Sequence, residues 1–111
     1  NLTRICVYEK GRLIPLDTKE IIYATVEDKN TVIVSSKGKF IVNYTLSQLS
    51  DKLDKYTFFR SHKSFLINLN MIEVIEPWFN STFNVTLKGA NVKIPVSRSQ
   101  SKEFKELMNI S

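Results

Sequence analysis

The chain has 111 residues, of which 42% are hydrophobic and 24% charged, so one small domain with a modest core is expected. The formal net charge of +5 suits a polyanionic partner such as nucleic acid or an anionic membrane surface. No segment approaches the ~18 apolar residues of a membrane span, and the charged opening predicts no signal peptide, so no membrane attachment is expected.

Several short strands are predicted before residue 45, because β-branched and aromatic residues gather in runs separated by polar turns. These runs are residues 3–8, 12–16, 21–26, 31–34 and 39–43. Pro15 lacks a backbone donor, so the second strand is expected at a sheet edge. Cys6 is the only cysteine and cannot form an internal disulfide. Its apolar neighbours predict a small buried core residue rather than a reactive thiol.

The apolar period changes in two places, and each change predicts a short helix. Residues 45–48 form a capping box, in which Thr45 caps the helix and Gln48 reaches back to it. Residues 97–100 repeat this arrangement, with Ser97 as the cap of a terminal helix. Apolar residues at helical spacing define the two buried faces, Leu46, Leu49 and Leu53 in the first helix and Phe104, Leu107 and Met108 in the second.

A basic turn separates two apolar runs in the second half of the chain. Residues 58–59 are interpreted as the end of one strand and residues 65–67 as the next. Phe59 and Leu66 are therefore expected in the core on either side of the turn. The segment 60–64 between them contains no acid and offers donors to an anionic backbone.

More strands are predicted toward the C-terminus. One covers residues 71–76 and ends at Pro77. Two others, residues 82–88 and 92–96, alternate apolar and polar side chains and form a hairpin with a short loop. The pair Trp78-Phe79 before this hairpin is expected to cap a small core rather than to form an exposed interaction patch.

About ten short strands and two short helices, without linkers or repeats, predict a mostly β fold of packed antiparallel sheets. Residues 1–111 are expected to form a single domain. Catalysis is not expected, because His62 and Cys6 are the only residues of their types and cannot build a metal cluster. The acids are scattered among lysines and no glycine-rich phosphate loop is present, so no cofactor is expected.

The segment 58–68 carries the pattern Phe-Phe-Arg-x-His-Lys-Ser-Phe-Leu-x-Asn. This pattern resembles the signature of the LytTR family, the DNA-binding output domain of bacterial response regulators. A second mark of that family, Val-Ser-Arg followed by a lysine-containing helix, is matched by residues 96–98 and Lys102. The segment 76–80 between them is similar to the autolysin-regulator branch. The resemblance covers residues 2–108, and two motifs in the right order make it specific.

The resemblance implies an elongated stack of antiparallel sheets and sequence-specific binding of double-stranded DNA, with loop side chains in the major groove. It also implies promoter direct repeats as sites, a cytoplasmic transcription regulator of a two-component system, and an N-terminal receiver domain, phosphorylated on aspartate, outside this sequence. The chain has no heptads and no obvious apolar stripe, so the isolated domain is expected to be a monomer that places two copies on each site. The alternative is a β-rich module that binds protein or RNA.

Family members place base-contacting residues at positions that match Asn30, Lys63 and Arg98. The Arg98 fork suits O6 and N7 of guanine, Lys63 suits guanine or a phosphate, and Asn30 suits adenine. The alignment of this first loop allows Lys29 or Thr31 in place of Asn30. Many relatives carry a basic residue here.

The candidate contacts lie in three loops, residues 27–30, residues 60–64 and the Ser97-Arg98 turn at a helix start. The acids Glu27 and Asp28 stand where many relatives have a basic loop. His62 either holds the turn by a hydrogen bond or contacts DNA directly. Arg60 either pairs with a nearby acid or contacts DNA. Ser97 begins a helix, where backbone N–H groups favour a phosphate.

Overall fold

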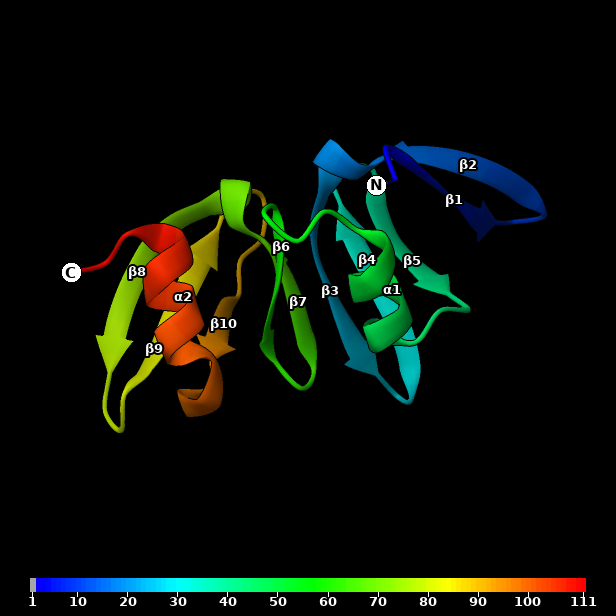
Figure 1. The fold of residues 1–111 in the computed structure, drawn as a ribbon. Coiled ribbons are helices and arrows are strands. Elements are labelled where there is room, and N and C mark those ends of the chain that lie inside the picture. Colours follow the sequence, from blue (N-terminus) through cyan, green and yellow to red (C-terminus); the bar gives the residue numbers. More distant parts are fainter. Residues whose placement is uncertain (1) are drawn as a thin grey trace.

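The computed structural model describes residues 2–111 and forms an elongated molecule of 46 × 28 × 24 Å (Figure 1). The strands are β1 (Arg4–Glu9), β2 (Arg12–Asp17), β3 (Ile21–Glu27), β4 (Asn30–Ser35), β5 (Gly38–Val42), β6 (Phe58–His62), β7 (Phe65–Asn68), β8 (Ile72–Trp78), β9 (Thr82–Leu87) and β10 (Lys93–Val96). The helices are α1 (Leu46–Lys52) and α2 (Ser101–Met108), with 3-10 turns η1 (Thr18–Glu20), η2 (Leu69–Met71) and η3 (Arg98–Gln100).

Three antiparallel sheets stack along the long axis of the molecule. The central sheet has five strands in the order β5-β4-β3-β7-β6. A three-stranded sheet, β10-β9-β8, lies with α2 on one side of it, and the β1-β2 hairpin lies with α1 on the other (Figure 1). This arrangement confirms the predicted mostly β fold of packed antiparallel sheets with two short helices.

The central sheet is covered on both faces, because neighbouring side chains along its strands point in opposite directions. Phe58 and Leu66 join the cluster under α1 and the β1-β2 hairpin. Phe59 and Ile67 join the second cluster, with the three-stranded sheet and α2. The expectation that Phe59 and Leu66 are core residues is confirmed, since their exposed fractions are 4% and 1%. Full burial of such side chains contributes ~1.5–3 kcal/mol each.

One of the two predicted helix caps is confirmed, and the other is wrong. The Gln48 N–H donates to Thr45 Oγ1 at 3.1 Å, and the Thr45 N–H donates to Gln48 Oε1 at 2.9 Å. Ser97 makes no such bond, because the chain first forms η3 and α2 begins only at Ser101. The Ser101 hydroxyl instead donates back to the Ser97 carbonyl at 3.0 Å.

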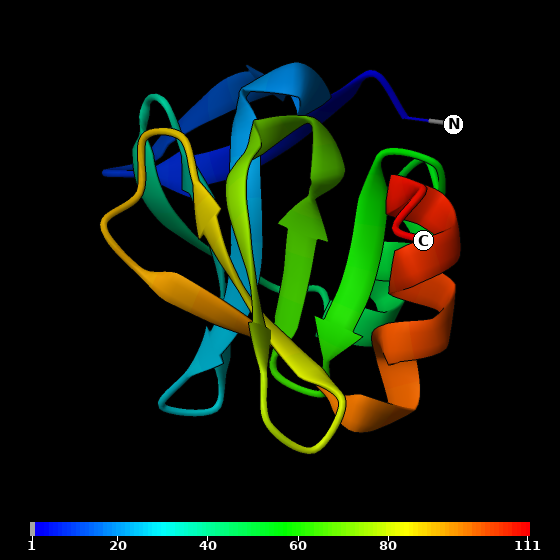
Figure 2. The same cartoon turned by 90° about the vertical axis from the view of Figure 1, so that its left-hand side faces the viewer.

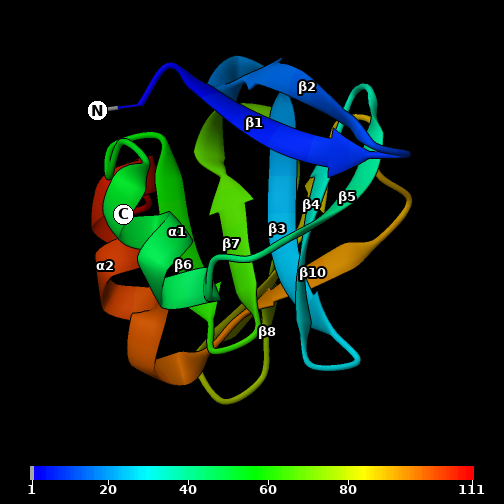
Figure 3. The ribbon, with the colours of Figure 1, turned by 90° about the vertical axis from the view of Figure 1, so that its right-hand side faces the viewer.

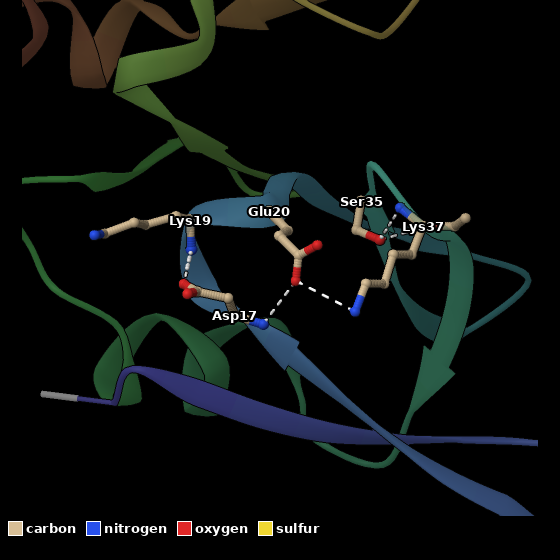
Figure 4. Close-up of polar contacts among 6 residues, drawn as sticks. Asp17, Lys19, Glu20, Ser35 and Lys37 are labelled. Carbon is tan, nitrogen blue, oxygen red and sulfur yellow. Dashed lines mark hydrogen bonds and ion pairs between the residues drawn. The ribbon is translucent and has the colours of Figure 1, made fainter.

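The polar connection 17–20 folds into η1, which joins β2 to β3 at one edge of the molecule (Figures 1 and 4). The Asp17 carboxylate accepts the Lys19 N–H at 2.9 Å. Glu20 Oε1 accepts the Asp17 N–H at 3.0 Å and lies 3.7 Å from Lys37 Nζ, on the neighbouring β4–β5 turn. This edge is therefore fixed by local hydrogen bonds and an ion pair.

Three local sequence predictions are wrong for physical reasons. The strand β6 begins at Phe58 rather than ending there, because a β-bulge lets it continue to His62. The strand β8 runs through Pro77, which is tolerated because β8 is an edge strand. Cys6 is exposed, because Ile5 and Val7 on either side of it point into the core.

Candidate nucleic-acid interface

The turn between β6 and β7 is braced by Arg60. Its Nε donates to the His62 carbonyl at 3.1 Å, and its Nη2 donates to the Lys63 carbonyl at 2.5 Å. Its Nη1 donates to Ser47 Oγ, at the start of α1, at 3.1 Å. Arg60 therefore holds the turn closed with neutral acceptors rather than pairing with an acid. The Lys63 side chain stays exposed at the tip.

His62 is fixed within the same turn, as one of its two interpretations predicts. Its Nδ1 accepts the Ser64 N–H at 3.1 Å, and its ring centroid lies 5.8 Å from that of Phe65. The neutral ring then carries its proton on Nε2, which is the donor left for a ligand. Ser61 is fully buried, so its hydroxyl cannot donate to an anionic backbone as the sequence suggested for the whole 60–64 segment.

The turn between β3 and β4 is a tight two-residue connection. Asp28 and Lys29 both adopt left-handed backbone conformations, with φ of 50° and 68°, and Glu27 pairs with Asn30 across the turn. This geometry matches the turn that best suits the twist of a two-stranded hairpin. Lys29 and Asn30 are exposed at its tip. The Glu27 carboxylate lies 3.4 Å from Lys39 Nζ, which offsets part of the negative charge noted in this loop.

The third turn leads from β10 into η3. The Ser97 N–H donates to the Ser61 carbonyl at 2.8 Å, which ties this turn to β6. Ser97 Oγ lies 3.3 Å from Ser99 Oγ and is half-buried. Arg98 is exposed, and no acid lies within ion-pair distance of it among residues 2–111.

The three turns lie at the same edge of the molecule, which is the lower edge in each view (Figures 1, 2 and 3). Along the long axis in Figure 1, the β3–β4 turn is followed by the β6–β7 turn and then by η3. Thr25 Oγ1, on the strand β3 that leads into the first turn, donates to the Ser64 carbonyl of the second turn at 2.9 Å. The structure thus gathers the candidate residues on one edge, the interface edge: Lys29, Asn30, Arg60, His62, Lys63, Ser97 and Arg98.

The sequence misjudged the pair Trp78-Phe79 at the end of β8. Their exposed fractions are 51% and 71%, so they do not cap the core. Phe83, the partner of Pro77 across the β8–β9 hairpin, is the aromatic residue that fills the core here, in contact with Phe104. The sequence did contain a signal for this exposure. Pro77 indicates an edge strand, and one face of such a strand is left uncovered.

Replacing Arg60 with alanine is expected to destabilise the domain by about 1–2 kcal/mol, because three hydrogen bonds that close the β6–β7 turn are lost. Affinity for the polyanionic partner that the net charge suggests should also fall. The fall should exceed what the loss of folded protein explains, since Lys63 is no longer held at the tip. Chemical denaturation and binding titrations measure both effects. An Arg60→Ala variant that matches the unchanged protein in both would contradict a bracing role.

No metal centre or membrane-spanning helix is found among residues 2–111. No group of three or more His, Cys, Asp or Glu side chains in this part of the chain is placed to hold a metal ion. Neither α1 nor α2 has the length and apolar character to cross a bilayer.

The chain is similar to proteins whose names describe gene regulation and signalling. It is 38% identical over 99 residues to transcriptional regulatory protein YpdB of Escherichia coli (strain K12), covering 89% of this chain and 41% of that protein. It is 42% identical over 98 residues to sensory transduction protein LytT of Bacillus subtilis (strain 168), covering 88% of this chain and 40% of that protein. The chain therefore spans well under half the length of these curated relatives.

The whole fold is shared with a solved structure, a LytTr DNA-binding domain from Bacillus cereus. The TM-score is 0.89 with 26% sequence identity, and the match covers 99% of this chain and 100% of the other. The family model described as the LytTr DNA-binding domain matches residues 11–109, which include all three turns of the interface edge. The agreement of motifs, fold and relatives leads to one conclusion: this chain belongs to the LytTr DNA-binding domain family.

Proposed function

We propose that the three turns at the interface edge bind double-stranded DNA sequence-specifically, with their side chains in the major groove. The observation that carries this proposal is the gathering of exposed Lys29, Asn30, Lys63 and Arg98 at one edge of the molecule. Neither helix projects from that edge as a recognition helix would, so loop side chains must reach the base edges. The domain is then the output part of a two-component transcription regulator.

The residues of the edge divide the work of recognition by their chemistry. Arg98 presents a planar fork that makes two hydrogen bonds to one guanine. Lys63 is a single flexible charge, which suits a phosphate and fixes the position of the domain on the duplex. Asn30 or Lys29 contributes a third contact in the groove at the β3–β4 turn. The remaining three candidates shape the turns and contribute hydrogen-bond donors near the DNA backbone: His62, Arg60 and Ser97.

The relatives are more than twice as long as this chain, which supports a further domain in the full protein. We propose that it is an N-terminal receiver domain phosphorylated on aspartate, in a cytoplasmic regulator. The isolated DNA-binding domain is a monomer, and two copies occupy direct repeats in a promoter. Analytical sedimentation tests this directly: a stable dimer without DNA would contradict it.

Binding to a duplex is expected to weaken steeply with salt, because Lys and Arg side chains release counterions from the phosphates they neutralise. About four such contacts give a slope of log affinity against log salt of roughly −3.6. Fluorescence anisotropy with a labelled duplex, repeated across a salt series, measures the slope.

Lys88→Gln provides a matched control, since it removes one charge from the β9–β10 loop at the opposite edge (Figure 1). Its slope should equal that of the unchanged protein. A slope near zero for the unchanged protein would contradict the electrostatic model. Equal affinity for an A-form RNA duplex of the same sequence would favour the alternative of an RNA-binding module.

A further inference from the structure

A fourth turn lies at the interface edge, beyond η3 along the long axis (Figures 1, 2 and 3). It consists of residues 79–81 and joins β8 to β9. Asn80 and Ser81 adopt left-handed conformations, with φ of 60° and 57°. The Ser101 hydroxyl donates to the Ser81 carbonyl at 2.5 Å, so the tip of this hairpin is tied to α2.

An open cavity of about 570 Å³ lies between this hairpin and α2. Pro77 and Trp78 contribute an apolar side to it. Arg98, Lys102 and Lys105 contribute a cationic side, since their spacing of four and three residues places them on one face of η3 and α2. None of the side chains that line the cavity in the described chain is acidic.

We infer that this cavity holds the sugar–phosphate backbone of the duplex, in the segment that flanks the base pair contacted by Arg98. The inference rests on the proposed DNA binding and adds a contact that none of the three turns supplies. A DNA strand presents an anionic phosphate beside an apolar deoxyribose at every nucleotide. Lys102 and Lys105 match the phosphate, and the ring of Trp78 matches the sugar.

The position of the cavity favours DNA over an acidic protein segment. Arg98 lines the cavity and also belongs to the third turn of the interface, so a duplex that follows this edge continues over the cavity. The exposed rings of Trp78, the last residue of β8, and Phe79, the first residue of the fourth turn, lie 5.7 Å apart by their centroids. A large exposed aromatic pair is explained if DNA covers it.

Two duplexes that share one binding site test this inference. The first ends at the base pair contacted by Arg98, and the second continues for about one helical turn of roughly ten base pairs beyond it. The longer duplex is expected to bind about ten-fold tighter at low salt, because two further phosphate contacts form. Trp78 is the only tryptophan in the chain, so its emission reports on this cavity alone. Its emission should change with the longer duplex and stay constant with the shorter one.

The double variant Lys102→Gln/Lys105→Gln should lose the gain from the longer duplex and lower the salt slope by about two. Phe79→Ser should reduce the gain without unfolding the domain, because the Phe79 side chain is largely exposed. Lys19→Gln/Lys88→Gln is the matched control, since it removes the same charge from exposed positions at the opposite edge and should keep the full gain.

Equal affinity for the two duplexes, with Trp78 emission unchanged, would overturn the inference and leave the proposed function intact. A Trp78 response to polyglutamate equal to that with the longer duplex would overturn it as well, since the cavity would then be a general anion site. Binding of neither duplex in any salt would overturn both the inference and the proposed function.

Discussion

Replacing Phe59 with alanine is expected to destabilise the domain by about 3–5 kcal/mol, the largest effect of any single substitution considered. The Phe59 ring is 4% exposed and stacks on Phe104, with centroids 5.8 Å apart. The ring centroid of Phe104 in turn lies 5.4 Å from that of Phe83. The truncation therefore opens a cavity where β6, β9 and α2 meet, and a domain of this size has only a small margin of stability.

Urea or guanidinium unfolding measures this loss, with Tyr56→Ala as the control. Tyr56 is also aromatic but is 85% exposed, so its truncation should change stability by less than ~0.5 kcal/mol. If Phe59→Ala and Tyr56→Ala unfold at the same denaturant concentration, the strand assignment around the central turn is wrong. At a temperature where Phe59→Ala is folded, DNA affinity should be largely retained, because the Phe59 side chain does not reach the surface.

Replacing Arg98 with alanine is expected to weaken binding to the preferred duplex by about 1–3 kcal/mol and to relax the preference at one base pair. Arg98→Lys should fail to restore that preference, because an ammonium group lacks the planar fork. Lys63→Ala, at the tip of the β6–β7 turn, should instead weaken all duplexes alike and reduce the salt slope by about one. Both side chains are exposed, so neither change should lower stability by more than ~0.5 kcal/mol.

Specific and non-specific affinities across a salt series, with a melting curve for each variant, separate these outcomes. Arg98→Ala that binds the preferred duplex as tightly as the unchanged protein would make Arg98 an ordinary surface residue at a helix start. A loss that follows unfolding would have the same meaning. Lys63→Ala that changes the preferred sequence would show that Lys63 contacts a base and not a phosphate.

The strands were predictable where apolar and polar residues alternate, as in β9 and β10, because one face of each packs on the core. The prediction that Cys6 is buried, which rested on the apolar composition around it, was wrong. The run Ile5-Cys6-Val7 is apolar throughout, but only one face of the β1-β2 hairpin is covered, so the middle residue points outward. The prediction that Trp78 and Phe79 cap the core was wrong for a related reason, since β8 is an edge strand and its end is left uncovered.

The candidate site was predictable at the level of residues, chiefly from the resemblance carried by segments 58–68 and 96–98. The sequence also led to the expectation of a domain that is not an enzyme, and membership of a DNA-binding domain family agrees with it. What no pattern showed is that three distant turns share an edge. That depends on long-range pairing, as in the Ser97 N–H to Ser61 carbonyl hydrogen bond.

The bracing role of Arg60 was equally hidden from the sequence, because it depends on the bulge in β6. The extra residue shifts the register between Phe59 and His62, and the Arg60 guanidinium then folds back over the turn. The same register buries Ser61, which the sequence had grouped with the exposed donors. Local strand irregularities of this kind re-aim side chains without leaving a clear pattern in the sequence.

Selection of bound duplexes from a random DNA library, at one stated salt concentration, tests sequence-specific recognition by the turns of the interface edge. The unchanged protein and Arg98→Lys are carried through the same rounds. We expect a short repeated element with a conserved guanine for the unchanged protein, and loss of the preference at that guanine for Arg98→Lys. Recovery of unrelated sequences by the unchanged protein, with the same outcome for Arg98→Lys, would contradict sequence-specific recognition through the turns of this edge.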